Sequence, residues 1–169
     1  STVIFGASAA ANGADTIAGF EAGSSASDGD VLDFTAFVTG GAIDSNGSAN
    51  TGTTAIAELT TASTGEISIA NKVVVFANGG SALTATSLAA EFADGTAGAG
   101  TTAAFADLDT AFKAVVIEGN AAGGAAGKIW YIDSSLDGSA GDVTASDIIL
   151  VGTLSTNIDI DAITGNQIA

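Results

Sequence analysis

The C-terminal half of the chain contains AVVIEGN (Ala114–Asn120), KIWYID (Lys128–Asp133) and DIILVGTL (Asp147–Leu154) in succession. Each run has the length of a strand and is rich in the β-branched and aromatic residues that favour strands. Glycine, serine and aspartate separate the runs, as expected for turns. We therefore predict three consecutive β-strands.

The rest of the chain extends this pattern. A β-prone run, TVIF (Thr2–Phe5), opens the sequence, and EISIA (Glu66–Ala70) and KVVVFA (Lys72–Ala77) predict a tight hairpin or two adjacent strands. Apolar residues among turn residues predict further short strands at Ile17, Phe20, Val31, Leu32 and Phe34. Short helices are predicted for three segments, 55–62, 87–95 and 103–112, the last from Phe105, Leu108 and Phe112 at helical spacing. The fold class is mostly β with a few short α-helices.

Composition excludes several classes of function. The formal net charge is −16, from 19 acidic residues against 3 basic ones, so nucleic acid and anionic membranes are not expected partners. No apolar run approaches the roughly 18 residues of a membrane-spanning helix. The chain has no cysteine for disulfides and no histidine for most zinc, copper or iron sites. Oxygen ligands remain, and these suit Ca²⁺.

The acidic residues gather in two windows. Five lie between residues 15 and 33 and four between residues 133 and 147. Like charges crowded in glycine-rich turns destabilise a fold unless a cation neutralises them, and Ca²⁺ accepts six to eight oxygens, backbone carbonyls included. The predicted calcium ligands of the two windows and of the adjoining turn are Asn12, Asp15, Glu21, Asp28, Asp30, Asp33, Asp133, Asp137, Asp142 and Asp147.

A third loop, from Asp44 through Asn46 to Asn50, carries oxygen-bearing side chains at alternate positions, like the start of an EF-hand loop. Its twelfth position is Ala55 instead of an acidic residue, so it is the weaker candidate. The alternative for every acidic loop is a solvated turn without a metal, because Asp and Gly are favoured in turns.

The segments NGADTIAGF and DGDVLDF, with Gly13, Asp15 and Ile17 in a G-x-D-x-apolar half-site, resemble the tail region of type I-secreted calcium proteins. These are RTX adhesins, surface-layer proteins and serralysin-like proteases. The C-terminal KIWYIDSSLDGSAGDVTASDIILVGTL is similar to the end of such proteins. The resemblance implies export in an unfolded state, folding by extracellular Ca²⁺, and an uncleaved secretion signal over Asn157–Ala169. The family's tandem nonapeptide array is missing.

These observations predict one compact β-rich domain over residues 1–169, a calcium-stabilised β-sandwich or short β-roll-like architecture. A division near residues 81–100 is the weaker alternative. Catalysis is not expected, since a carboxylate pair or a Ser–Lys nucleophile would have to act without His, Cys or Arg, and no S-x-x-K or G-x-S-x-G motif occurs.

The function expected is that of a secreted, extracellular or cell-surface structural protein that self-assembles into a filament or surface lattice. The proposed contact is a homo-oligomeric or homopolymeric one through Thr2–Phe5, a strand able to complete a neighbour's sheet. The alternative is a C-terminal calcium-folded secretion or anchoring module of a larger adhesin or secreted enzyme.

Overall fold

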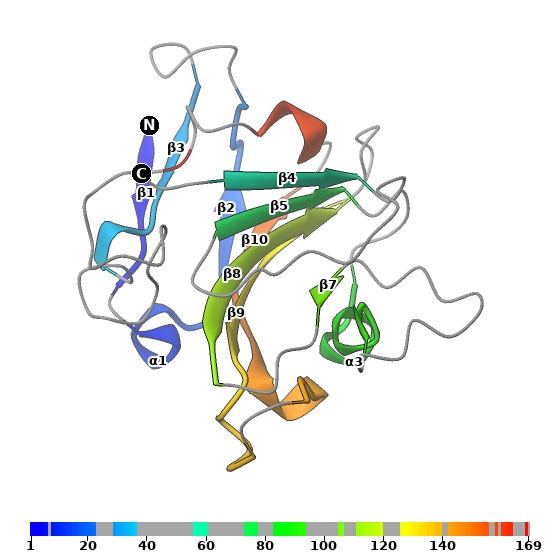
Figure 1. The fold of residues 1–169 in the computed structure, drawn as a ribbon. Helices are drawn as coiled ribbons and strands as arrows, with labels where there is room; N and C mark the ends of the chain where they lie inside the picture. The colour runs from blue at the N-terminus through cyan, green and yellow to red at the C-terminus, as the bar shows by residue number, and fades with distance from the viewer. Residues whose placement is uncertain are drawn as a thin grey trace.

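The computed structural model describes residues 1–6, 8–22, 29–36, 56–60, 73–77, 83–93, 105–106, 111–119, 126–139, 142–155, 158, 160–163 and 168. Their architecture is layered, with a central mixed sheet that has other elements on both sides (Figure 1). Strands outnumber helices among these residues, which confirms the β-rich class with a few short helices.

The centre of the sheet is an antiparallel meander of three consecutive strands. These are β8 (Lys113–Gly119), β9 (Gly127–Asp133) and β10 (Ile148–Ser155), and they confirm the three strands predicted from the sequence. Most residues of β8 and β9 are buried on alternate faces, so both faces of the sheet are covered. Burial on both faces explains why these strands are continuous apolar runs without polar alternation.

Parallel strands extend the meander at both edges. β5 (Val73–Ala77) pairs with β8, β4 (Ile56–Thr60) pairs with β5, and β2 (Asp15–Ala18) pairs with β10. The strand order is β2-β10-β9-β8-β5-β4, in which only β9 runs in the opposite direction. The hairpin partner expected over residues 66–70 lies outside the described residues.

The β1–β3 cover packs on one face of the sheet. It consists of β1 (Thr2–Ile4) and β3 (Val31–Asp33), paired in parallel, with α1 (Ala9–Asn12) and the 3-10 helix η2 (Ile160–Ala162). Beneath it, the rings of Phe5 and Phe34 stack with centroids 4.5 Å apart. Its core joins residues from both ends of the chain to the sheet, namely Phe5, Phe20, Leu32, Phe34, Val73, Val75, Val115, Ile117, Ile129, Tyr131, Val151, Leu154, Ile160 and Ile163.

The α3 cover packs on the opposite face (Figure 1). We use this name for residues 83–93, which contain α3 (Ala85–Ala89) and β6 (Phe92–Ala93), together with β7 (Phe105–Ala106), which pairs in parallel with β6. Aromatic rings fill this core, with the Phe105 ring 5.1 Å from both Phe76 and Phe92. The apolar residues of the sheet beneath it include Val74, Val116, Trp130 and Ile132.

Two of the three predicted helices are wrong where the structure describes them. Residues 56–60, within predicted helix 55–62, form strand β4, and Phe105–Ala106, within 103–112, form strand β7. Isolated helices this short are marginal, whereas pairing with β5 or β6 satisfies the backbone polar groups at once. The third helix exists as α3, but it begins earlier, after the Thr84 N-cap, and ends at Ala89.

None of the helices in the described ranges is long and apolar enough to cross a membrane. Both covers pack against the same sheet, and the described part of 81–100 lies within the α3 cover.

Candidate functional site

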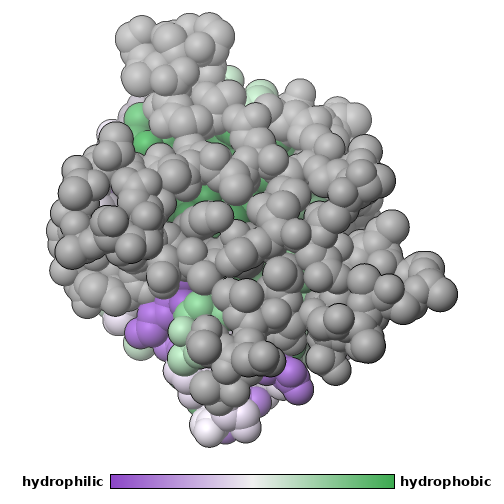
Figure 2. Space-filling model, viewed as in Figure 1, coloured by the Kyte–Doolittle hydropathy of each residue, from purple (hydrophilic) through white to green (hydrophobic). Residues whose placement is uncertain are grey.

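The second acidic window forms the connection between β9 and β10. Asp133 ends β9, and Asp147 ends the 3-10 helix η1 (Ala145–Asp147) that leads into β10. The connection from Ser135 to Ser139 is exposed, as is Asp142. Figure 2 shows hydrophilic residues at the lower end of the view, where Figure 1 places this connection.

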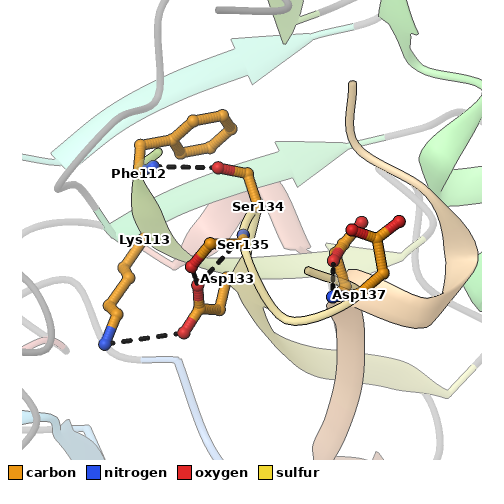
Figure 3. A network of polar contacts seen from close by, with 7 residues as sticks. Phe112, Lys113, Asp133, Ser134, Ser135 and Asp137 are labelled. Carbon is orange, nitrogen blue, oxygen red and sulfur yellow. Dashed lines mark hydrogen bonds and ion pairs between the residues drawn. The ribbon is translucent and has the colours of Figure 1, made fainter. Parts of the chain in front are cut away.

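Asp133 faces Lys113 across β9 and β8, with 3.5 Å between the ammonium nitrogen and Oδ2 (Figure 3). Its Oδ1 accepts hydrogen bonds from the Ser135 N–H at 3.2 Å and from the Ser135 hydroxyl at 2.7 Å. Burial raises the pKa of Asp133, but the Ser135 hydrogen bonds and the Lys113 charge outweigh it and leave the pKa below its usual value. Asp133 is therefore an ionised group with a cationic partner of its own.

Burial lowers the pKa of Lys113, yet the neighbouring Tyr131 and Asp133 outweigh it and leave that pKa raised. The pKa of Tyr131 is raised, chiefly because its phenol is buried. Next to Asp133, the buried Ser134 ties the start of the β9–β10 connection to Phe112, the residue before β8. Its hydroxyl oxygen accepts from the Phe112 N–H at 2.9 Å, and its own N–H donates to the Phe112 carbonyl at 3.0 Å.

Asp137 and Asp147 come together around Thr144. The fully buried Asp147 accepts the Asp137 N–H on Oδ1 at 2.9 Å, and its Oδ2 accepts the Thr144 N–H at 2.9 Å. The Thr144 hydroxyl lies 2.8 Å from Asp147 Oδ2 and 3.3 Å from Asp137 Oδ2. One hydroxyl proton thus serves two carboxylates, of which Asp147 is enclosed and Asp137 is exposed.

The first acidic window lies in the β1–β3 cover. Asp30 Oδ1 lies 2.5 Å from the Ser1 nitrogen, and its Oδ2 accepts the Glu21 N–H at 3.0 Å. The hydrogen bond from the terminal ammonium and the one from Glu21 lower the pKa of Asp30. Asp33 Oδ1 accepts the Thr35 N–H at 2.8 Å. Asp30 therefore ties the residue before β1 to the segment before β3, whereas Asp33 closes a turn after β3.

The other candidates of this window are spread out. Asn12 closes the turn before β2, because its side chain accepts the Gly6 N–H at 2.5 Å and donates to the Ser8 carbonyl at 2.8 Å. Asp15 is exposed in β2, opposite Gly152 of β10, and Glu21 is exposed.

Asp28, Asp44 and Asn46 lie outside the described residues. Within the described ranges, no three acidic side chains form a group that could hold a metal. Any calcium ligand set built on Asp137 and Asp147 therefore requires further oxygens, such as carbonyls, hydroxyls or water.

Sequence reasoning missed a turn motif that recurs in both windows. Asp33, Asp133 and Asp137 each accept, on Oδ1, the N–H of the residue two positions on, at 2.8, 3.2 and 2.8 Å. The signal was available as D-x-S or D-x-T, which is typical of aspartate-closed turns. The pattern T-x-x-D likewise indicates the capping box of Thr144 and Asp147.

Comparisons with protein-family models, with curated proteins and with solved structures gave no match.

Proposed function

We propose that this chain is a calcium-stabilised, secreted bacterial structural protein that self-assembles into an extracellular filament or surface lattice. The observation that carries the proposal is the Asp137–Thr144–Asp147 arrangement, in which one hydroxyl proton serves two carboxylates. Its setting is a chain of formal net charge −16.

Calcium suits this loop for a physical reason. Asp147 is fully buried and already orients Thr144 and the Asp137 peptide, while Asp137 faces solvent and is open to an arriving ion. Ca²⁺ would complete its shell with carbonyl, hydroxyl and water oxygens, which a loop of this kind supplies. One site at ten times its Kd adds about 1.4 kcal/mol of stability by mass action.

Self-assembly is supported by strand β1. Its residues are uncharged, one of its edges pairs with β3, and Ile4 is 72% exposed. An uncharged strand at the edge of a sheet is a template for pairing with another chain. A structural role also suits a chain without histidine or cysteine, the commonest catalytic bases and nucleophiles.

The test is thermal unfolding of the pure chain in millimolar Ca²⁺, in Mg²⁺ and in EDTA, read by the single Trp130. We expect Ca²⁺ to raise the melting temperature and Asp137→Asn to reduce that increment. The comparison variant is Asp15→Asn, an exposed acid of β2 that lies outside this connection. A calcium increment in Asp137→Asn as large as that of the parent chain would remove this loop as the site, and indifference of the parent chain to chelation would refute the calcium proposal.

Negative-stain microscopy of the same samples tests assembly. Polymers in Ca²⁺ that are lost in EDTA support the structural role. Calcium-folded monomers would instead favour a C-terminal secretion or anchoring module of a larger adhesin or secreted enzyme.

A further inference from the structure

One buried carboxylate lies outside both acidic windows, on the face of the sheet that the α3 cover packs against. Glu118 of β8 is fully buried, and its Oε1 accepts two hydrogen bonds, from the Leu83 N–H at 3.0 Å and from the Trp130 indole N–H at 3.1 Å. Burying a carboxylate costs free energy unless donors and a positive charge compensate it. Leu83 belongs to the α3 cover and Trp130 to β9, and both lie in the core between this cover and the sheet.

The positive charge comes from the neighbouring strand. Lys128 of β9 lies directly opposite Glu118 in the β8–β9 register. Its ammonium group donates to the Leu83 carbonyl oxygen and lies 5.2 Å from the centre of the Trp130 ring. Glu118 and Lys128 therefore act on the same two residues, Leu83 and Trp130.

Leu83 is consequently held by both of its main-chain polar groups, the N–H by an anion and the carbonyl by a cation. It stands immediately before Thr84, the N-cap of α3, so it is the residue at which the α3 cover meets the sheet. After Leu83, apolar residues of the α3 cover such as Leu88 and Phe92 pack against the sheet. Apolar contacts are not directional, whereas two charge-assisted hydrogen bonds fix one position.

We propose that Glu118 and Lys128 form a charge clamp on Leu83 that docks the α3 cover, and that loss of the clamp releases this cover from the sheet while the sheet stays folded. Release would uncover the apolar face formed by Val74, Val116 and Trp130. The clamp is thus a conformational device for the second core, and its two charged residues lie outside the acidic connection.

The chain contains its own matched control. Lys113 and Asp133 are a second pair of opposite charges in register on the same two strands, but on the other face and at the other end. Their side chains contact each other, Ser135 and Tyr131, none of which belongs to the α3 cover. Variants of this pair change the charge of β8 and β9 without touching the clamp.

The experiment is hydrogen exchange, followed by NMR, at the Leu83 amide and at the α3 amides of Leu88 and Ala90. In Lys128→Met the Leu83 carbonyl oxygen loses its ammonium donor, so we expect Leu83 to exchange about ten- to a hundred-fold faster, the scale of one lost hydrogen bond to a charged group. Trp130 emission should shift to longer wavelength. The amides of β8 and β9 should keep their protection.

Glu118→Gln keeps the acceptor and removes the charge, so its effect on exchange should be smaller than that of Lys128→Met. The double variant Glu118→Gln/Lys128→Met removes both charges that act on Leu83, and its exchange rate compared with those of the two single variants measures the coupling between them. If Lys128→Met does not fold, the test uses two other variants, Glu118→Gln and Trp130→Phe. The exchange rate of the Leu83 amide in each is compared with that in Lys113→Met.

Two results would overturn the proposal. In one, Leu83 and α3 exchange no faster in the clamp variants than in Lys113→Met. In the other, β8 and β9 lose protection together with α3, which would mean that the whole domain opens and that no separate cover is released.

Discussion

At the scale of single residues, the charges of Asp133 and Lys113 depend on one another. The pKa of Asp133 lies below the ordinary value of 3.8 for an aspartate, so its ionised form stabilises the folded state. For a lowered carboxylate pKa, this contribution is present above the unfolded pKa and is lost as the pH falls through the folded one. The pKa of Lys113 is raised above 10.5, so its contribution is present below that pH and is lost as the pH rises through the folded pKa.

We therefore expect Asp133→Asn to be less stable than the parent chain at pH 7 and to approach it as the pH falls below about 3.8, the unfolded pKa. Urea denaturation at a series of pH values from 7 to acid measures the difference in the free energy of unfolding. Asp142→Asn, in the same exposed connection, controls for the loss of one negative charge. A gap between Asp133→Asn and the parent that stays constant down to acid pH would contradict the assigned pKa direction.

The candidate residues were predictable as acidic windows, but their partners were not. The acidic window identified Asp137 and Asp147, and the T-x-x-D pattern predicts the contact of Thr144 with Asp147, but no local pattern brings Asp137, ten residues before Asp147, to the same hydroxyl. Asp15 and Asp33 look equivalent in the sequence, yet one is exposed in β2 and the other closes a turn after β3. Glu118 stands within an apolar run, and no pattern around it predicts its role. That role depends on Leu83, which donates a hydrogen bond to it, and on Lys128 of the neighbouring strand, both of which are distant in the sequence.

At the scale of elements, the close contact between η2 and the sheet depends on two glycines. Gly119 of β8 and Gly127 of β9 lie next to each other on neighbouring strands. The Ile160 side chain packs against both. A Cβ on Gly127 would lie 2.9 Å from Ile160 Cδ1 and 3.2 Å from the Glu118 carbonyl oxygen. Such distances require either the helix or the strand to move.

Gly127→Ala should therefore lower the free energy of unfolding by about 1–3 kcal/mol, the usual cost of overpacking. Ile160→Val removes the Cδ1 atom of the clash, so the alanine should cost less in that background. Urea denaturation of the parent, both single variants and the double variant measures the coupling. Strictly additive effects would show that Ile160 does not restrict this position.

Strands in the meander were predictable because β8, β9 and β10 are long apolar runs separated by turns. The segments at 56–60 and 105–106 were predicted as parts of helices because a short run of apolar residues fits both the period of a helix and that of a strand. Their strand state is decided by partners distant in the sequence, as is the parallel pairing of β2 with β10. Pairings of this kind leave no local signal.

At the scale of the whole molecule, the sheet is covered on both faces and the acidic connection lies at one end. Within the described residues, an edge strand or a projecting apolar side chain is therefore the place to look for a contact between copies. The exposed large hydrophobic residues in the described part of the chain are Ile4 in β1 and Leu136 in the β9–β10 connection. Deleting the first strand is a poor test of assembly, because the buried Phe5 stacks on Phe34 and β1 pairs with β3.

A single charge on β1 is the sharper test of the proposed contact. Ile4 is 72% exposed, so Ile4→Lys should change the free energy of unfolding by no more than about 0.5 kcal/mol. A lysine on an edge strand opposes pairing with another chain, so polymers of the parent in Ca²⁺ should be absent or much shorter in this variant by negative stain and light scattering. The control is Leu136→Lys, which adds the same charge at a side chain that is 49% exposed. Normal polymers from Ile4→Lys together with their loss in Leu136→Lys would move the contact from β1 to the β9–β10 connection.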